Sequence, residues 1–343
     1  MRRGFQEFPG RHRRFAALAV IAGLAAGLGL AGCASDTGPV NLANVTRASE
    51  VDPAGVTSGP AAVPPPAGPA PNCGDPTASL RPPASMPTPG TMPAGSTMQA
   101  IKQRGALIAG VDQNTYLFGY RDPTTNNIQG FDIDMVNYIA YAILGPGFKV
   151  EFKAINSDQR TTALQNHQVD IVVRTFTVNC ARRQQVAFST VYFDAQQRLL
   201  VERNSTVQTL NDLGGKKVCA ATGSDSLTQI QNTPSHPIPV SVNDWSDCLV
   251  MLQQGEVDAV TTDDAILAGM ASQDPNTKIV GPSLESEPYA IAMPLGEDDM
   301  VRFVNGVLDT VRNNNAWEKS YVSWLGNRLA PTPPPPPSPS YSD

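Results

Sequence analysis

The sequence predicts an α/β fold with two lobes, and three observations support this prediction. Of 31 prolines in 343 residues, only nine lie between Gln99 and Ala330, which is an ordinary share for a globular domain. That stretch is long enough for one large domain or two small lobes with a sizeable core. Within it, expected strands and helices alternate, and the alternation occurs in two similar runs.

The first run begins with a short apolar strand over Ala106–Val111. Apolar residues then recur at helical spacing from Phe131 to Ile143, and Gly145-Pro146-Gly147 ends the helix. Alternation over 148–152 predicts a second strand. A polar helix at 158–167 and a buried strand at 169–173 complete the run.

The second run repeats this order. Its expected elements are the strand Lys217–Ala221, the helix Ser226–Gln231, the strand Ile238–Val242, the helix Asp244–Gln254, the strand Val257–Thr261 and the helix Asp264–Ala271. Ligands of such sheets bind beyond the carboxyl ends of the strands. The sequence therefore predicts a binding site where two such edges meet.

Charge and composition exclude several functional classes. Residues 99–330 carry 18 Lys or Arg against 25 Asp or Glu, so we expect no nucleic-acid partner. Three scattered histidines and the absence of a Cys-x-x-Cys pair predict no metal site and no cofactor.

The N-terminus has the features of an export signal. Five arginines in the first fourteen residues precede the apolar run Phe15–Leu30, which ends in Leu30-Ala31-Gly32-Cys33. This ending resembles a bacterial lipobox, so we expect a signal peptide at 1–32 and a lipid on Cys33. The chain would then be held on the extracytoplasmic face of the cell membrane. An uncleaved transmembrane helix is the alternative.

Proline-rich segments flank the expected folded part. Residues 33–98 are rich in Pro, Ala, Gly, Ser and Thr, a composition that favours an extended tether over a packed core. Residues 331–343 have a similar composition and are expected to form a tail.

Four cysteines remain besides Cys33, and export places them in an oxidising compartment. They allow three pairings. Cys219 lies in an expected strand and Cys248 in an expected helix nearby, so we expect these two to bridge, which leaves Cys73 to pair with Cys180. Buried free thiols are the alternative.

Several stretches, in this order along the chain, resemble one known family. They are Gly105–Asp112, Leu117–Tyr120, Gly130–Asp134, Ala163-Leu164 with Val169-Asp170, Thr177–Arg182, Phe188–Tyr192, Asp212–Val218 and Gly255–Val260. Together they resemble the family 3 extracellular solute-binding proteins, the polar amino-acid receptors of ABC importers, and most of all actinobacterial glutamate- and glutamine-binding lipoproteins. The resemblance implies a periplasmic-binding-protein type II fold, with two lobes and a hinge of two crossing strands.

The resemblance also implies ligand-binding residues. Thr177 and Arg182 have the spacing of the family's Thr-x-Thr-x-x-Arg, which holds the α-carboxylate, although Asn179 replaces the second Thr. A planar cation paired with hydroxyls suits that group. The alternative for Arg182 is a surface position. Asp263, preceded by Thr262, matches the carboxylate that takes the ammonium group, and helix capping is its alternative.

Further contacts are expected around the ligand. Asp225, through its N–H, and Ser226, through its hydroxyl, begin a helix whose N-terminus suits an anion, and plain capping by Ser224 or Asp225 is the compatible alternative. Arg174 is expected to bind an acidic side chain, or else to form an internal ion pair with Asp112, which contacts the side-chain amide in glutamine-binding relatives. Tyr116 is expected to form part of the ligand's wall.

These expectations define the predicted function. The chain is expected to be a monomeric receptor that binds glutamate, aspartate or their amides and presents the ligand to an ABC permease. An amino-acid sensor feeding a transmembrane signalling receptor is the alternative. An exported dehydratase-like enzyme is disfavoured because no acid–base pair is placed. The expected boundaries are 99–192 and 292–330 for lobe 1, 197–286 for lobe 2, and 193–196 and 287–291 for the hinge.

Overall fold

The structure is a computed structural model that describes residues 55–62, 72–326, 328–330 and 332–343. Cys33 and the predicted signal peptide lie outside the described residues. Within them, no helix combines the length and the apolar character needed to cross a membrane. The described chain has a mixed α/β fold with separate hydrophobic cores, which confirms the predicted fold class.

Lobe 1 is built around a parallel set of strands covered by helices on both faces. In register, Leu107 lies opposite Val150 and Ala109 opposite Ile171. The strands are β2 (Leu107–Val111), β6 (Val150–Ala154) and β7 (Ile171–Val172). The helices are α1 (Thr97–Arg104), α2 (Phe131–Leu144), α3 (Arg160–Gln165), α4 (Cys180–Arg183), α8 (Asp298–Asn313) and α9 (Ala316–Trp324). A small sheet of β3 (Asn114–Thr115), β4 (Gly119–Arg121) and β5 (Ile128–Gln129) lies beside them.

Lobe 2 repeats the plan with its own core. Val240 of β10 lies opposite Cys219 of β9, and Val260 of β11 lies opposite the same cysteine on the other side. The elements are β9 (Lys217–Ala221), β10 (Ile238–Val242), β11 (Ala259–Asp263), β12 (Thr277–Val280), α5 (Asp225–Asn232), α6 (Trp245–Gln253) and α7 (Asp264–Gln273). The predicted strand at 257–261 is thus displaced by two residues, which brings Thr262 and Asp263 into the strand.

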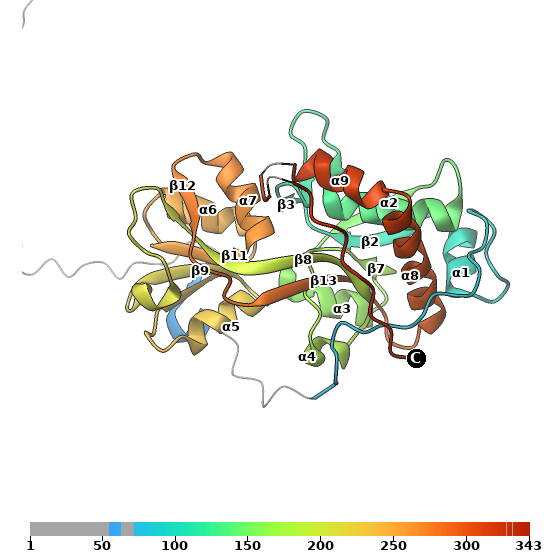
Figure 1. Ribbon diagram of the computed structural model, residues 1–343, viewed down its shortest axis with the longest axis horizontal. Helices are drawn as coiled ribbons and strands as arrows, with labels where there is room; N and C mark the ends of the chain where they lie inside the picture. Colours follow the sequence, from blue (N-terminus) through green and yellow to red (C-terminus); the bar gives the residue numbers. More distant parts are fainter. Residues whose placement is uncertain (1–54, 63–71, 327, 331) are drawn as a thin grey trace, which may run out of the picture. The chain divides into compact units, whose positions relative to one another are not determined.

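Two long strands connect the lobes. β8 (Ala187–Glu202) pairs with β13 (Ser286–Met293) over its first part and with β11 and β12 over its last. The continuous order is β1-β10-β9-β11-β8-β13-β7-β2-β6, in which β1 is the short strand Thr57–Ser58. β8 and β13 pass between the helices of the two lobes (Figure 1). The predicted hinge segments fall within these strands.

Both predicted cysteine pairs are bonded in the structure. Cys219 of β9 is bridged to Cys248 of α6 inside lobe 2. Cys73 is bridged to Cys180, the first residue of α4, across a sequence separation of 107 residues.

The proline-rich flanks contain residues that pack on the folded body, a result that composition did not predict. β1 (Thr57–Ser58) adds an antiparallel edge to β10 of lobe 2, and Ala62 is buried in that lobe's core. On lobe 1, Ser79 forms a parallel bridge with Tyr341. The Asn305 side chain of α8 donates hydrogen bonds to the Ser79 hydroxyl and the Leu80 carbonyl. Backbone pairing, a disulfide and a few buried apolar side chains such as Ala62 and Met92 hold these segments.

Candidate functional site

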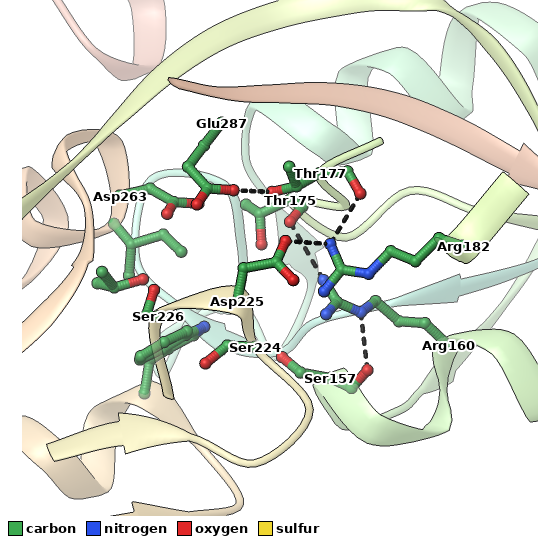
Figure 2. Close-up of a pocket in the computed structure, with 13 residues that line it drawn as sticks. Ser157, Arg160, Thr175, Thr177, Arg182, Ser224, Asp225, Ser226, Asp263 and Glu287 are labelled. Carbon is green, nitrogen blue, oxygen red and sulfur yellow. Dashed lines mark hydrogen bonds and ion pairs between the residues drawn. The ribbon is translucent and has the colours of Figure 1, made fainter. Parts of the chain in front are cut away.

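A closed polar cleft lies between the two cores. Thirteen residues line it, drawn from both lobes and from β13 (Figure 2). Its free volume is about 10 Å³, which is room for about one water molecule. The lining residues are Ser157, Arg160, Thr175, Thr177, Arg182, Ser224, Asp225, Ser226, Trp245, Thr262, Asp263, Ile266 and Glu287. Six of the nine predicted ligand-binding residues are among them: Thr177, Arg182, Asp225, Ser226, Thr262 and Asp263.

Arg182 is fixed on the lobe 1 wall by its own helix and by a backbone acceptor. The Asn179 side chain caps α4 by accepting a hydrogen bond from the Arg182 N–H at 2.9 Å. This gives Asn179, the departure from the family's motif, a local role. The guanidinium donates to the Thr177 carbonyl at 2.8 Å and forms an ion pair with Asp225 of lobe 2 at 2.7 Å (Figure 2). Arg182 is therefore a partly buried cation facing the cleft.

Arg160 is a second cleft cation, and the sequence did not single it out. Its guanidinium carbon lies 4.2 Å from the centre of the Phe176 ring, which Arg182 also approaches at 5.1 Å. It donates hydrogen bonds to backbone carbonyls only, those of Ser157, Arg174, Thr175 and Gly223. None of these acceptors carries a formal charge, so no hydrogen-bonded carboxylate compensates the guanidinium, and burial, followed by the nearby Arg182 and Arg174, lowers the pKa of Arg160. Its place in a short polar helix gave no signal of burial.

The opposite wall is acidic. Asp263 occupies the N-cap position of α7 by its backbone, yet its side chain makes no capping bond. Instead it accepts a hydrogen bond from the Tyr289 hydroxyl. The neighbouring Asp264 takes the local role by accepting from the Ala265 and Gln196 N–H groups. The Asp263 carboxyl is therefore free to face the cleft, although burial raises its pKa well above the usual value.

Glu287 of β13 is a further cleft residue that the sequence assigned only to the hinge. It is buried, and one carboxyl oxygen accepts a hydrogen bond from the Thr177 hydroxyl (Figure 2). The other oxygen is buried without a hydrogen-bond partner, as is the hydroxyl of Thr262. Burial, and then the nearby Asp263, raise the pKa of Glu287. Its role could not be seen in the sequence because it depends on how β13 crosses the cleft.

The start of α5 completes the cleft from lobe 2. Ser224 is the side-chain cap, accepting from the Leu227 N–H at 3.3 Å, while Asp225 and Ser226 line the cleft. Gly223 just before has φ +76°, and a Cβ there would lie 2.7 Å from the Cα of Asp158 in lobe 1. Only glycine fits this close approach of the two lobes.

Three predicted residues lie outside the cleft lining. Arg174 is fully buried and forms an ion pair with Asp112 at 2.8 Å, the alternative that the sequence had left open. Asp112 also accepts hydrogen bonds from Gln113, Asn114 and Thr115. Tyr116 packs its ring on Tyr120, and its carbonyl oxygen approaches Gly269 of α7. In the part of the chain that the structure describes, no group of three His, Cys, Asp or Glu residues could hold a metal ion.

Comparison with known proteins identifies the family. The sequence model of the bacterial extracellular solute-binding proteins, family 3, matches residues 107–327. Among curated relatives, the chain is 36% identical to the ABC transporter glutamine-binding protein GlnH of Bacillus subtilis, over 66% of this chain and 83% of that protein. It is 28% identical to the glutamate-binding protein GluB of Corynebacterium efficiens, over 65% and 80%.

Solved structures agree with these relatives. An ancestral arginine-binding protein bound to glutamine is 33% identical, with a TM-score of 0.61 over 65% of this chain and 99% of that one. A mutant of ArgBP from T. maritima is 27% identical, with a TM-score of 0.63 over 67% of this chain and 99% of that one. These neighbours support the two-lobed type II fold that the resemblance implied. The family consists of binding proteins rather than enzymes, and this chain belongs to the bacterial extracellular solute-binding proteins, family 3.

Proposed function

We propose that this chain is an extracytoplasmic receptor that binds a polar α-amino acid between its lobes and delivers it to an ABC permease. Arg182 and Thr177 would hold the α-carboxylate, with the N-terminus of α5 closing on the same group, and Asp263 would hold the ammonium group. The curated relatives named for glutamine and glutamate binding support this ligand class.

One observation carries the proposal: the cleft has two walls of opposite charge. The guanidinium groups of Arg160 and Arg182 lie on one wall, and the carboxyl groups of Asp263 and Glu287 lie on the other (Figure 2). An α-amino acid presents a carboxylate and an ammonium on one carbon, so it complements both walls at once. Because the lining comes from both lobes, a bound amino acid would also hold the lobes together.

The ligand's side chain would be bound by Arg160 rather than by Arg174. Arg174 forms an ion pair with Asp112 and is not one of the residues that line the cleft. Arg160 lines the cleft and donates only to neutral carbonyl groups, so its guanidinium can also donate a hydrogen bond to an oxygen of a side-chain carboxylate or amide. The proposed ligands are therefore glutamate, aspartate and their amides, with Arg160 favouring the acidic forms.

Calorimetric titration of the full-length chain with glutamate, glutamine, aspartate and asparagine tests the proposal. We expect saturable binding of at least one of them. Arg182→Ala and Asp263→Asn should each weaken it by about 10- to 100-fold, because each removes one charged partner of the ligand. Failure of the wild-type chain to bind any of the four would contradict the proposed function.

A pair of arginine variants tests how the side chain is read. Arg160→Met should weaken glutamate binding more than glutamine binding, because a carboxylate loses more than an amide when the cation is removed. Arg203→Met is the matched control, since Arg203 is exposed on lobe 2 and donates to the Pro275 carbonyl. Equal losses for glutamate and glutamine in Arg160→Met would contradict the role given to Arg160.

Membrane attachment remains part of the proposal. Cys33 would carry the lipid, and residues 34–54 would lead from it to the first described segment. Metabolic labelling with a radioactive fatty acid should label the wild-type chain and leave Cys33→Ser unlabelled. Label on the Cys33→Ser chain would contradict the assignment.

A further inference from the structure

One carboxyl oxygen of Glu287 is buried in the cleft without a hydrogen-bond partner among the described residues. It is 2% exposed, and Thr177 supplies the only hydrogen bond described for its carboxyl group. The remaining carboxyl oxygen is buried, has no partner and belongs to a residue that lines the cleft. Leaving a buried polar atom unpaired is costly. A bound ligand is the partner that this position makes available.

The charged groups around Glu287 indicate the sign of that partner. Asp263 and Asp225 act on it as like charges, and Arg182 is the opposing cation. Asp263 in turn faces Asp264, Arg160 and the hydroxyl of Tyr289. On β8, which is paired with β13, Asp194 lies opposite Pro288 and is exposed. The immediate surroundings of Glu287 are therefore more acidic than basic and favour a cation.

Without such a cation, two buried carboxyl groups that line one cleft cannot both be ionised at low cost. Burial raises the pKa of both Asp263 and Glu287, and the charge of Asp263 raises the pKa of Glu287 further. The empty cleft therefore retains a proton on this pair near neutral pH. An ammonium group placed between them has the opposite effect, because it stabilises the ionised carboxylates.

We propose that Glu287 and Asp263 together bind the ligand's ammonium group, and that this pair of carboxyl groups releases a proton to solvent when the ammonium group binds. The inference rests on the amino-acid receptor function proposed above and adds a residue and a proton to it. This exchange of a proton for an ammonium group is balanced in charge, because one positive charge replaces another and the net charge of the binding site does not change. Only a carboxyl O–H bond breaks, and water or buffer accepts the proton.

Calorimetry of the full-length chain in two buffers measures this proton. Glutamate and glutamine are titrated near neutral pH in phosphate and in Tris, whose ionisation enthalpies differ. We expect the apparent binding enthalpy to differ between the buffers by an amount that corresponds to release of up to one proton. Affinity should also tighten as the pH rises from about 6 to about 8, by at most about tenfold per pH unit for one proton. Binding with no proton release would overturn the inference while leaving the receptor function intact.

Two variants test whether the released proton comes from Glu287. Glu287→Gln keeps the shape of the side chain but cannot ionise, so proton release should fall and the pH dependence should flatten. Glu285→Gln is the control, because Glu285 is exposed on the same segment and outside the cleft lining, and it should behave as wild type. Unchanged proton release in Glu287→Gln would overturn the assignment.

Glutarate provides a test on the wild-type chain that needs no substitution. It has both carboxylates of glutamate and lacks the ammonium group. We expect it to bind at least tenfold more weakly than glutamate, without proton release, because a charge-assisted hydrogen bond is lost. Proton release on glutarate binding equal to that of glutamate would show that the ammonium group is not the trigger, and would contradict the proposal.

Discussion

Two arginine–aspartate pairs in this protein have similar lengths and different surroundings. Arg174 and Asp112 are 2.8 Å apart, with 0% and 4% of their side chains exposed, and both belong to lobe 1. Arg182 and Asp225 are 2.7 Å apart, with 13% and 31% exposed, and they join lobe 1 to lobe 2 across the cleft. The first pair lies within one lobe, and the second joins the two lobes.

This difference suggests different roles for the two pairs: Arg174–Asp112 is a structural contact, whereas at Arg182 the partner Asp225 can be exchanged for another anion. Asp112 is held by three further hydrogen bonds from its own loop, so no other group can replace it at Arg174. Asp225 has only the weak 3.4 Å contacts of Asn179 besides Arg182. A ligand carboxylate could therefore replace Asp225 at Arg182. Burial and the number of fixed partners, rather than distance, distinguish the two roles.

The largest effect is expected from breaking the buried pair. Arg174→Met leaves Asp112 as a buried charge without its cation, which should lower the free energy of unfolding by about 3–5 kcal/mol. Thermal and urea unfolding would measure this loss. The double variant Asp112→Asn, Arg174→Met should recover part of it, because neither residue then carries a charge. A single variant as stable as wild type would contradict the structural role of the pair.

Breaking the exposed pair should affect binding rather than folding. Arg182→Met removes the proposed partner of the α-carboxylate, so affinity should fall by about 10- to 100-fold, while stability changes by about 1 kcal/mol or less. Calorimetry and thermal unfolding of the same sample separate the two quantities. A large loss of stability with unchanged affinity would reverse the assignment.

Neutralising Asp225 should have a smaller effect of the opposite sign. Asp225→Asn keeps the backbone N–H of α5 and removes the carboxylate that competes for Arg182, so affinity should rise by about two- to fivefold. Small-angle scattering of the empty protein should show a larger radius of gyration, because one contact between the lobes is weakened. Weaker binding in Asp225→Asn would indicate that its charge contacts the ligand directly.

Salt should produce the smallest effect and should distinguish the pairs without mutation. Raising ionic strength from about 0.1 M to about 1 M shortens the screening length from about 10 Å to about 3 Å, which weakens exposed pairs more than buried ones. The empty wild-type protein should therefore open slightly in salt. Asp225→Asn should show no such response, and an equal response in both proteins would contradict this explanation.

The sequence predicted much of the fold because its signals are local. Short local runs of apolar residues predicted β9 and β10 at their observed bounds. β8 was not predicted as one long strand because its residues pass from one core to the other and carry no single pattern. The hydrogen bond between Ser79 and Asn305 joins residues that are far apart in the chain, and the composition of a segment contains no information about such long-range contacts.

The same distinction applies to the site. Thr177, Arg182 and Asp263 could be found because their motif spacing is short. Arg160 and Glu287 were missed because their place in the cleft depends on how separate elements meet. For Arg174 the sequence left two alternatives open, a contact with an acidic ligand or an ion pair with Asp112, and only the three-dimensional structure shows the ion pair.

The bridge between Cys73 and Cys180 has a consequence for how the receptor matures. Cys180 is the first residue of the short helix that carries Arg182, so the guanidinium proposed to hold the ligand is mounted two residues from a disulfide. Such bonds form and persist outside the cytoplasm. Newly made chains would therefore gain this covalent support for α4 only after secretion.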